Sequence, residues 1–207
     1  MANQEHQFSK VFCLGLSKTG TTSMGKYFSK LGYRVCHQNV NKEHDIDKIY
    51  KFCDQKIDEY DMFQDLPWPV TFTRYMKRFP DSKYILTYRS LDRWLNSMSI
   101  YADKSIPLHQ AIYGNSIYKG NEIEFRDFYV THICNIVKAF KDNPGRLLMI
   151  NIENDNWYIT KALQGFLGIS VEDKNMYPVS NKGNKNALKW YINRHKWKKL
   201  ANSARFQ

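Results

Sequence analysis

The sequence predicts an α/β protein with a mostly parallel sheet, and two observations lead to this prediction. Short apolar runs alternate along the chain with segments whose apolar residues recur at helical spacing. The first run, residues 11–16, is followed at once by a polar loop and then by a helical segment. With 207 residues, 43% of them hydrophobic, the chain can form one domain with its own core. We therefore expect a single domain over residues 1–207, with a basic C-terminal loop and helix at about 179–207.

Apolar runs, helix caps and helix-ending residues predict the elements of residues 11–80. A strand over 11–16 precedes a helix from Thr22 to Leu31, for which Thr21 or Thr22 is the N-cap. Gly32 stands directly after that helix, where a left-handed residue commonly ends one. The further expected elements are a strand at 33–37, a polar helix at 43–56, a short strand at 62–65, and a helix at 71–79 that Pro80 stops.

From residue 83 on, predicted strands and helices continue to alternate. Residues 83–88 are the clearest internal strand, and Trp94, Leu95 and Met98 follow at helical spacing. A glycine- and serine-containing stretch at 103–121 is expected to be a loop or lid. The helix at 123–140 is expected to face the core with one apolar stripe: Phe125, Phe128, Tyr129, Ile133, Ile136, Val137 and Phe140. The remaining elements are a turn at 144–145, a buried strand at 147–152, a helix at 157–167 ended by Gly168, then a polar loop and a basic helix.

Positive charge is concentrated in the C-terminal tail. The chain has 31 basic and 20 acidic residues, for a formal net charge of +11. Eight of the bases lie between Lys182 and Arg205, and removing them leaves 23 basic against 20 acidic residues. This tail would suit a polyanionic ligand, or it is a solvated helix.

The cysteines and the hydropathy pattern predict a soluble intracellular protein. The four cysteines are far apart and form no C-x-x-C pair, which is typical of a reducing compartment such as the cytoplasm. The polar start of the chain lacks the apolar stretch of a signal peptide. No window approaches 18 uncharged apolar residues, so we expect no membrane span.

The loop from Gly15 to Ser23, GLSKTGTTS, is the most informative stretch. Strand, glycine-containing loop and helix together present backbone N–H groups to a phosphate. The G-x-x-x-x-G spacing matches the first half of a nucleotide P-loop, but Thr21 stands where that loop has lysine. The lysine is instead Lys18, which we expect to meet oxygens beyond a 5′-phosphate. A capped helix start with a glycine turn is the structural alternative.

The stretch K-T-G-T-T-S after an apolar strand resembles the 5′-phosphosulfate loop of sulfotransferases that use 3′-phosphoadenosine 5′-phosphosulfate (PAPS). That family also has an arginine at a strand end and a serine eight residues later on the 3′-phosphate. Here Arg89 and Ser97 have this spacing, although a surface base and a polar helix residue would look the same. A glycine-containing basic loop, residues 179–186, matches a third family feature, or it is a solvated loop. Residues 147–169 are similar to the family's late strand and helix.

The resemblance implies a three-layer α/β/α, P-loop-like nucleotide-binding fold and a set of donor-binding residues. Cytosolic members stack a tryptophan on adenine where this chain has Ser23, so the sequence leaves open how adenine is held. The implied ligands of the donor PAPS and its product 3′-phosphoadenosine 5′-phosphate (PAP) are Lys18, Thr19, Gly20, Thr21, Thr22, Ser23, Arg89, Ser97, Lys182 and Gly183.

Sulfuryl transfer requires charge stabilisation on the leaving phosphate and a base for the acceptor. Lys18 is the expected electrostatic partner of the leaving group. Cytosolic members have a His-x-Pro base where this chain has Asp65-Leu66-Pro67, which makes Asp65 the expected general base. His37 and His109 are the rivals, and Asp-x-Pro is also a turn opener.

Two other function classes remain open. One is a P-loop kinase or NTPase with an unusual loop, for which Glu153 is the candidate magnesium ligand. The other is a nucleic-acid-binding module using the basic tail with Trp190, Tyr191 and Trp197, although the rest of the chain offers no such surface. For the leading hypothesis we expect no metal, and an acceptor hydroxyl or amine on a carbohydrate or small molecule. The basic tail would suit an anionic glycan.

Overall fold

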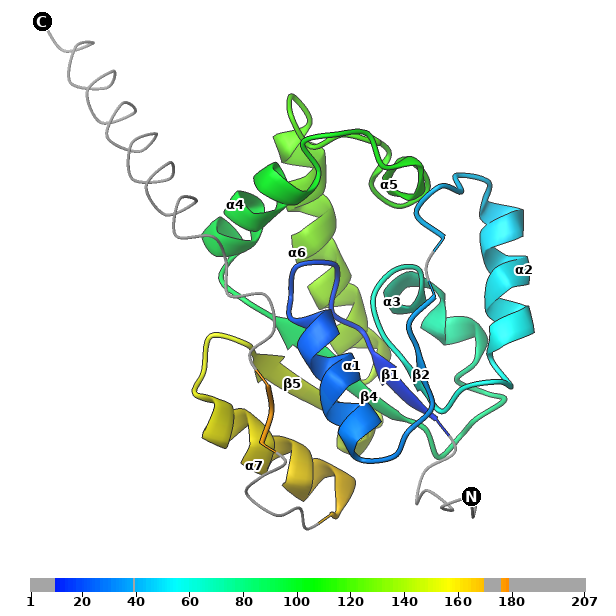
Figure 1. The fold of residues 1–207 in the computed structure, drawn as a ribbon, viewed down its shortest axis with the longest axis vertical. Coiled ribbons are helices and arrows are strands. Elements are labelled where there is room, and N and C mark those ends of the chain that lie inside the picture. Colours follow the sequence, from blue (N-terminus) through cyan, green and yellow to red (C-terminus); the bar gives the residue numbers. More distant parts are fainter. Residues whose placement is uncertain (1–9, 39, 170–175, 179–207) are drawn as a thin grey trace, which may run out of the picture.

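The computed structural model describes residues 10–38, 40–169 and 176–178, in which a five-stranded sheet lies between helical layers (Figure 1). All four strand pairings are parallel, in the order β2-β3-β1-β4-β5. The strands are β1 (Val11–Cys13), β2 (Val35–Cys36), β3 (Met62–Phe63), β4 (Lys83–Tyr88) and β5 (Leu147–Asn151). This confirms the predicted three-layer α/β fold. It also brings the loops that follow β1, β3, β4 and β5 to one edge of the sheet.

The helices cover both faces of the sheet and its carboxyl edge. They are α1 (Thr21–Lys30), α2 (Ile46–Lys56), α3 (Trp68–Thr71), α4 (Leu91–Tyr101), α5 (Pro107–Tyr113), α6 (Glu122–Ala139) and α7 (Asn156–Leu167), with 3₁₀ turns η1 (Phe72–Arg74) and η2 (Pro144–Arg146). No helix among the described residues is long and apolar enough to span a bilayer.

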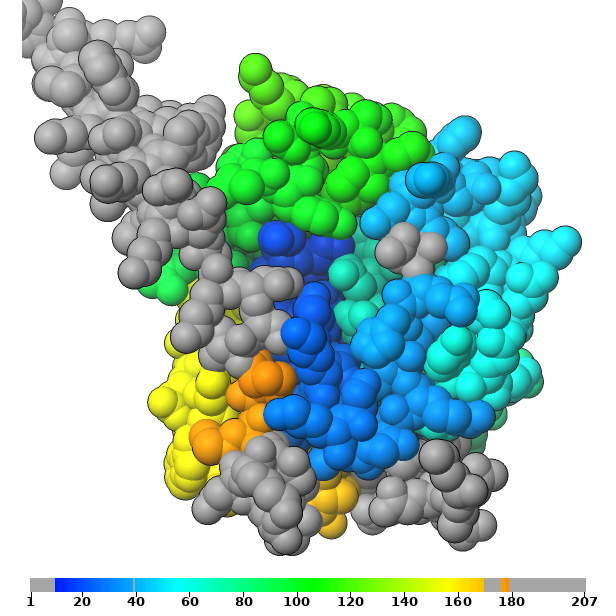
Figure 2. Space-filling view, in the orientation of Figure 1, coloured from blue at the N-terminus to red at the C-terminus, as the bar shows by residue number. Residues whose placement is uncertain are grey.

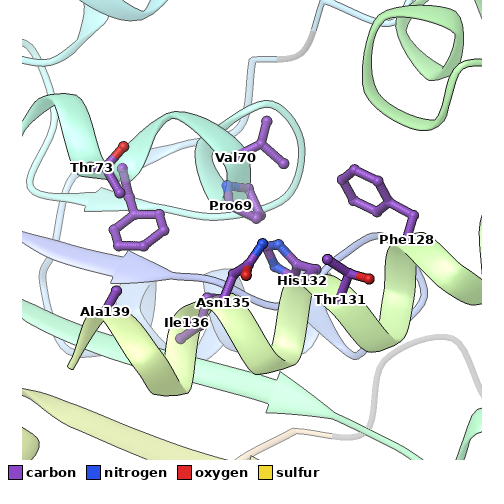
Figure 3. A pocket seen from close by; sticks show the side chains of 10 residues that line it. Pro69, Val70, Thr73, Phe128, Thr131, His132, Asn135, Ile136 and Ala139 are labelled. Atoms are coloured by element: carbon purple, nitrogen blue, oxygen red, sulfur yellow. The ribbon is translucent and has the colours of Figure 1, made fainter. Parts of the chain in front are cut away.

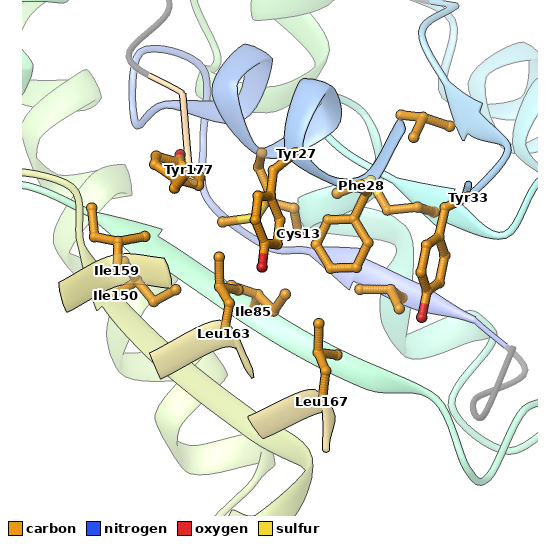
Figure 4. Packing of buried hydrophobic residues seen from close by; sticks show 14 residues of the cluster. Cys13, Tyr27, Phe28, Tyr33, Ile85, Ile150, Ile159, Leu163, Leu167 and Tyr177 are labelled. Atoms are coloured by element: carbon orange, nitrogen blue, oxygen red, sulfur yellow. The ribbon is translucent and has the colours of Figure 1, made fainter. Parts of the chain in front are cut away.

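Side chains on β1 alternate between two apolar cores. Val11 and Cys13 face α1 and α7, where Tyr27 and Leu163 are fully buried (Figure 4). Phe12 and Leu14 face α2, α3 and α6 on the other side. The alternation follows from the two-residue period of a strand, and burial of both faces of the sheet explains the continuous apolar sequence at β1.

A third apolar cluster fills the space below α4 and α5. Trp94 is fully buried and stacks on Tyr129 of α6, with ring centroids 4.3 Å apart. Leu108 of α5 and Phe125 of α6 are fully buried in the same cluster. This cluster attaches α4 and α5 to the edge where the strands end.

Four predictions about elements were wrong in part. The expected loop at 103–121 contains α5, which starts at Pro107 and buries Leu108 and Ile112. A proline at the first helical position starts such a helix well, and the surrounding glycines and serines concealed it. The helix expected at 71–79 is the short α3 followed by η1, and it begins earlier, at Trp68.

The other two corrections concern exposure. Val137 is 45% exposed, because the buried stripe of α6 runs through Tyr129, His132 and Ile136 instead. The strand at 147–152 is not fully buried: β5 is the edge strand of the sheet, and Met149 is 42% exposed.

Candidate active site

The loop between β1 and α1 has the shape of an anion cradle. The N-cap of α1 is Gly20, so the prediction of Thr21 or Thr22 was wrong, and both threonines lie inside the helix. Gly20 has φ of +84°, and no described side chain caps the first N–H groups of that helix. The loop is held from behind by Trp94, whose indole N–H donates to the carbonyl of Ser17 at 3.0 Å. Figure 2 shows part of the loop (dark blue) at the surface, beside green residues of α4 and α5. Uncapped helix N–H groups at a surface favour binding of a phosphate-type anion.

Gly15 lets the loop lie directly on β4. A Cβ atom at Gly15 would be 1.9 Å from Oγ1 of Thr87 and 2.3 Å from Oγ1 of Thr19. The two threonine hydroxyls are 3.0 Å apart, and the Thr19 hydroxyl donates to the Leu16 carbonyl at 2.6 Å. Thr19 therefore holds the loop from inside. Thr19 is fully buried and its backbone N–H also donates to the Leu16 carbonyl, at 3.1 Å, so its contacts are within the protein.

The carboxylate of Asp65 joins the turn after β3 to this loop. Its Oδ1 accepts a hydrogen bond from the Ser17 hydroxyl at 2.6 Å and from the Leu66 N–H at 2.9 Å. Its Oδ2 accepts from the Thr21 hydroxyl at 3.1 Å. Asp65 also has a left-handed backbone, with φ of +63°. The structure thus brings the expected base to the loop that is expected to bind PAPS. Three hydrogen bonds fix the orientation of the Asp65 carboxylate.

Lys18 lies at the mouth of the loop. Its backbone is left-handed, with φ of +73°, and its ammonium lies 4.9 Å from the centroid of the Tyr101 ring. Burial lowers the pKa of Lys18, the nearby Asp65 charge opposes this, and Arg89 adds to the lowering. The charges of Asp65 and Arg89 are therefore close enough to affect Lys18, and the Tyr101 ring of α4 lies beside its ammonium group.

Arg89 begins a second polar cluster, directly after β4. The Tyr129 hydroxyl accepts from the Arg89 N–H at 3.1 Å and donates to the Arg89 carbonyl at 2.8 Å. Nε of Arg89 lies 3.5 Å from Oε1 of Glu153, and Arg93 lies 3.4 Å from the same oxygen. The Ser90 hydroxyl donates to Glu153 at 3.2 Å. We call Arg89, Ser90, Arg93 and Glu153 the arginine cluster.

The structure describes only some of the other residues that are expected to bind PAPS. Ser97 is half-buried on α4, Thr22 is exposed at the start of α1, and Ser23 is buried. Lys182 and Gly183 lie outside the described residues, as does the basic tail with its interleaved aromatic residues.

The structure shows contributors that the sequence analysis missed. The Tyr177 hydroxyl donates to the Gly20 carbonyl at 3.2 Å, and Tyr177 packs against Tyr27 of α1. Burial raises the pKa of Tyr177, and a hydrogen bond with Ser23 opposes this. Tyr177 therefore supports the start of α1 from a segment 157 residues away. Its one local signal is that it is an aromatic residue in a polar segment.

The rival bases have different surroundings. His37 is exposed. His109 is 1% exposed, among the rings of Tyr101, Tyr113 and Phe125, and burial lowers its pKa to about 4. A histidine with so low a pKa is a weak proton acceptor. Of the three candidates, Asp65 is the one hydrogen-bonded to the loop.

Glu153 does not resemble a magnesium ligand. Its carboxylate accepts from Ser90 and lies beside two guanidinium groups. These ion pairs and this hydrogen bond of Glu153 weigh against the NTPase alternative.

Parts of this chain are similar in sequence to a known family and to a fungal protein. Residues 10–109 match the family described as the sulfotransferase domain. The Ava biosynthesis cluster protein M of Aspergillus versicolor is 33% identical over 107 residues, which are 43% of this chain and 41% of that protein.

Two solved sulfotransferases have a similar fold. The mouse sulfotransferase SULT7A1, solved as a complex with PAP, superposes with a TM-score of 0.52 at 18% identity, covering 83% of this chain and 62% of that one. A sulfotransferase from Alicyclobacillus acidocaldarius gives a TM-score of 0.53 at 13% identity, covering 86% and 87%. This chain therefore spans less than two thirds of the fungal and mouse proteins.

Proposed function

Because residues 10–109 of this chain match the family described as the sulfotransferase domain, we propose that the protein is a sulfotransferase whose donor is PAPS. The acceptor is a hydroxyl or amine of a carbohydrate or small molecule. The product nucleotide is PAP, the ligand named for the mouse structure. A family motif alone would not support a donor assignment. The geometry at the carboxyl edge of the sheet adds independent support.

The observation that supports the proposal is that the start of α1 and Arg89 follow two adjacent strands. The uncapped start of α1 follows β1, Arg89 follows β4, and these strands are direct neighbours. PAPS carries anionic groups at both ends of its ribose, the 5′-phosphosulfate and the 3′-phosphate. We assign the first to Lys18 and the loop from Thr19 to Ser23, and the second to Arg89 with Ser97. Lys182 and Gly183 are further proposed ligands of the 3′-phosphate.

The proposed reaction is an in-line displacement at sulfur. The acceptor oxygen or nitrogen forms a bond to sulfur, and the bond from sulfur to the bridging phosphate oxygen breaks with its electron pair. Lys18 and the α1 N–H groups stabilise the negative charge that develops on the leaving phosphate. Asp65 takes the acceptor proton, and the Ser17 and Thr21 hydroxyls hold its carboxylate in position. Every group that acts here belongs to the chain itself, and we propose no metal.

Calorimetric titration with PAP in EDTA tests this function directly. We expect PAP to bind without metal and more tightly than ADP or magnesium-ATP. Arg89→Ala should weaken PAP binding by about tenfold or more, because hydrogen bonds to charged groups are worth about 1.5–3 kcal/mol. Arg126→Ala is the matched control, since that arginine is exposed on α6 and pairs with Asp127. A preference for magnesium-ATP, or equal PAP binding by wild type and Arg89→Ala, would overturn the proposal.

A further inference from the structure

A groove of about 260 Å³ lies between α3 and α6, away from the donor loop (Figure 3). It is on the face of the sheet that carries Phe12 and Leu14, whereas α1 packs on the opposite face. Its apolar lining is mainly Pro69, Phe72, Phe128 and Ile136. The sheet therefore separates the groove from α1, the helix whose N-terminus we propose to bind PAPS.

His132 is the polar side chain buried in this groove. It is 8% exposed, and Figure 3 shows its ring projecting from α6 toward Pro69. Its Nε2 lies 2.8 Å from the Leu14 carbonyl, an acceptor, so Nε2 carries the proton and donates. Burial lowers the pKa of His132, and the Leu14 contact opposes this, so the ring is neutral at pH 7.

The neutral ring leaves Nδ1 as a hydrogen-bond acceptor. Among the described residues no hydrogen bond to Nδ1 is present, and Nδ1 is not one of the fully buried polar atoms without a partner, so it is accessible from the groove. The proposed transfer reaction does not use it. A molecule in the groove that donates to Nδ1 therefore gains a hydrogen bond there. Thr73, Thr131 and Asn135 line the exposed rim and can bind a second polar group or water.

The lining also limits the charge and size of an occupant. Among the described residues that line the groove, none is an Asp, Glu, Lys or Arg. A charged ligand would lose its hydration there without gaining a counter-charge. The groove volume of about 260 Å³ is below the roughly 300–1,000 Å³ of a drug-sized pocket.

We propose that this groove binds a neutral, single-ring molecule carrying a hydroxyl group, which donates to Nδ1 of His132 while the ring packs on Pro69, Phe72 and Phe128. This site is separate from the donor site and does not depend on the proposed sulfuryl transfer. One hydrogen bond connects it to the loop after β1, because the Leu14 carbonyl accepts from His132 and Leu14 directly precedes Gly15.

Ligand-observed NMR with three probes of one size tests the chemistry. Benzyl alcohol should bind about two- to twelvefold more tightly than toluene, the range that one hydrogen bond of 0.5–1.5 kcal/mol gives. Benzoate should not bind. In protein labelled with ¹⁵N-histidine, benzyl alcohol should shift the Nδ1 resonance of His132, and toluene should leave it nearly unchanged. Equal binding of benzyl alcohol and toluene, or no binding of either, overturns the proposal.

Filling the groove tests its location. Ala139→Phe adds a ring at an exposed lining position of α6 and should weaken benzyl alcohol binding by about fivefold or more. Val137→Phe is the matched control, since Val137 is 45% exposed on the same helix and does not line the groove. The two variants should have the same thermal midpoint. Undiminished binding by Ala139→Phe would place the probe elsewhere and refute the assignment.

Discussion

The Ser17 hydroxyl donates a hydrogen bond of 2.6 Å to Oδ1 of Asp65 and so joins the loop after β1 to the turn after β3. The Thr21 hydroxyl donates to the other carboxylate oxygen at 3.1 Å, from the first turn of α1. Asp65 is therefore a support for the donor loop as well as the candidate base. The two roles predict different kinetic effects of substitution.

Replacement of Asp65 by asparagine separates these roles. We expect Asp65→Asn to lower kcat by about 10²–10⁴-fold, the usual contribution of a general base, while PAP affinity changes by less than about fivefold. The reason is that the amide oxygen can still accept from Ser17, but the amide cannot take a proton at neutral pH. Steady-state kinetics and PAP titration on the same samples provide both values.

Ser17→Ala is the complementary control for Asp65. It removes a donor to the carboxylate and leaves the proton acceptor in place, so kcat should fall much less than in Asp65→Asn. If both variants lower kcat and PAP affinity to the same extent, Asp65 is a positioning residue and not the base.

The contact of the donor loop with β4 makes a prediction about stability. Gly15→Ala places a Cβ 1.9 Å from Oγ1 of Thr87 and 2.6 Å from the Thr87 carbonyl. The backbone must move, and we expect a loss of about 1–3 kcal/mol in the free energy of unfolding together with weaker PAP binding. Gly165→Ala in α7 is the control, because nothing lies within 4 Å of its Cβ position. That variant should be more stable by up to about 1 kcal/mol in urea unfolding. Equal stability of the two variants would contradict this account of the loop.

The loop and the strand ends could be predicted from sequence because their signals are local. The apolar run at β1, the glycines and hydroxyl residues after it, and the helical spacing after Arg89 all lie within short windows. Asp65 was proposed because Asp65-Leu66-Pro67 stands where cytosolic sulfotransferases have a His-x-Pro step. Such features depend on strand and turn chemistry that a few neighbouring residues determine.

The residues that support the site could not be found in this way. Thr87 matters because Gly15 lies on it, Tyr129 because its hydroxyl reaches Arg89, and Tyr177 because it packs at Gly20. Each contact joins segments at least 40 residues apart and follows from tertiary packing, which leaves no local pattern. Likewise, α5 was missed because the glycines and serines around it predict a loop, and its burial beneath α4 and against α6 outweighs that local preference.

The arginine cluster predicts that Glu153 opposes donor binding. Its carboxylate lies beside Arg89 and Arg93, where the proposed 3′-phosphate also requires positive charge. Glu153→Gln keeps an acceptor for the Ser90 hydroxyl and removes the negative charge. We expect PAP affinity to rise by up to about fivefold at low ionic strength, since partly exposed ion pairs are worth at most about 1 kcal/mol, and the gain should shrink in high salt. Calorimetric titration at two salt concentrations measures it. Weaker PAP binding by Glu153→Gln would mean that the carboxylate orders Arg89 instead.

His109 makes the folded protein sensitive to acid. Burial among aromatic rings lowers its pKa to about 4 from an ordinary value of 6.5. Above pH 6.5 the ring is neutral in both the folded and the unfolded chain, so no stability is lost. Between pH 6.5 and pH 4 the unfolded chain takes up a proton that the folded chain does not, so the free energy of unfolding should fall with pH by about 3 kcal/mol in total. Below pH 4 this residue adds no further loss.

Replacement of His109 by phenylalanine should remove most of that pH dependence. A phenyl ring can keep the contacts with Tyr101, Tyr113 and Phe125 and does not titrate. Urea unfolding midpoints at pH 7.5, 6 and 5 should converge in His109→Phe relative to wild type. Part of the decline should remain, because burial also lowers the pKa of His132. His37→Phe, at an exposed position, should decline as wild type does. Parallel decline of His109→Phe and wild type would show that the buried imidazole is not the source, since the loss would then come from groups outside the aromatic cluster.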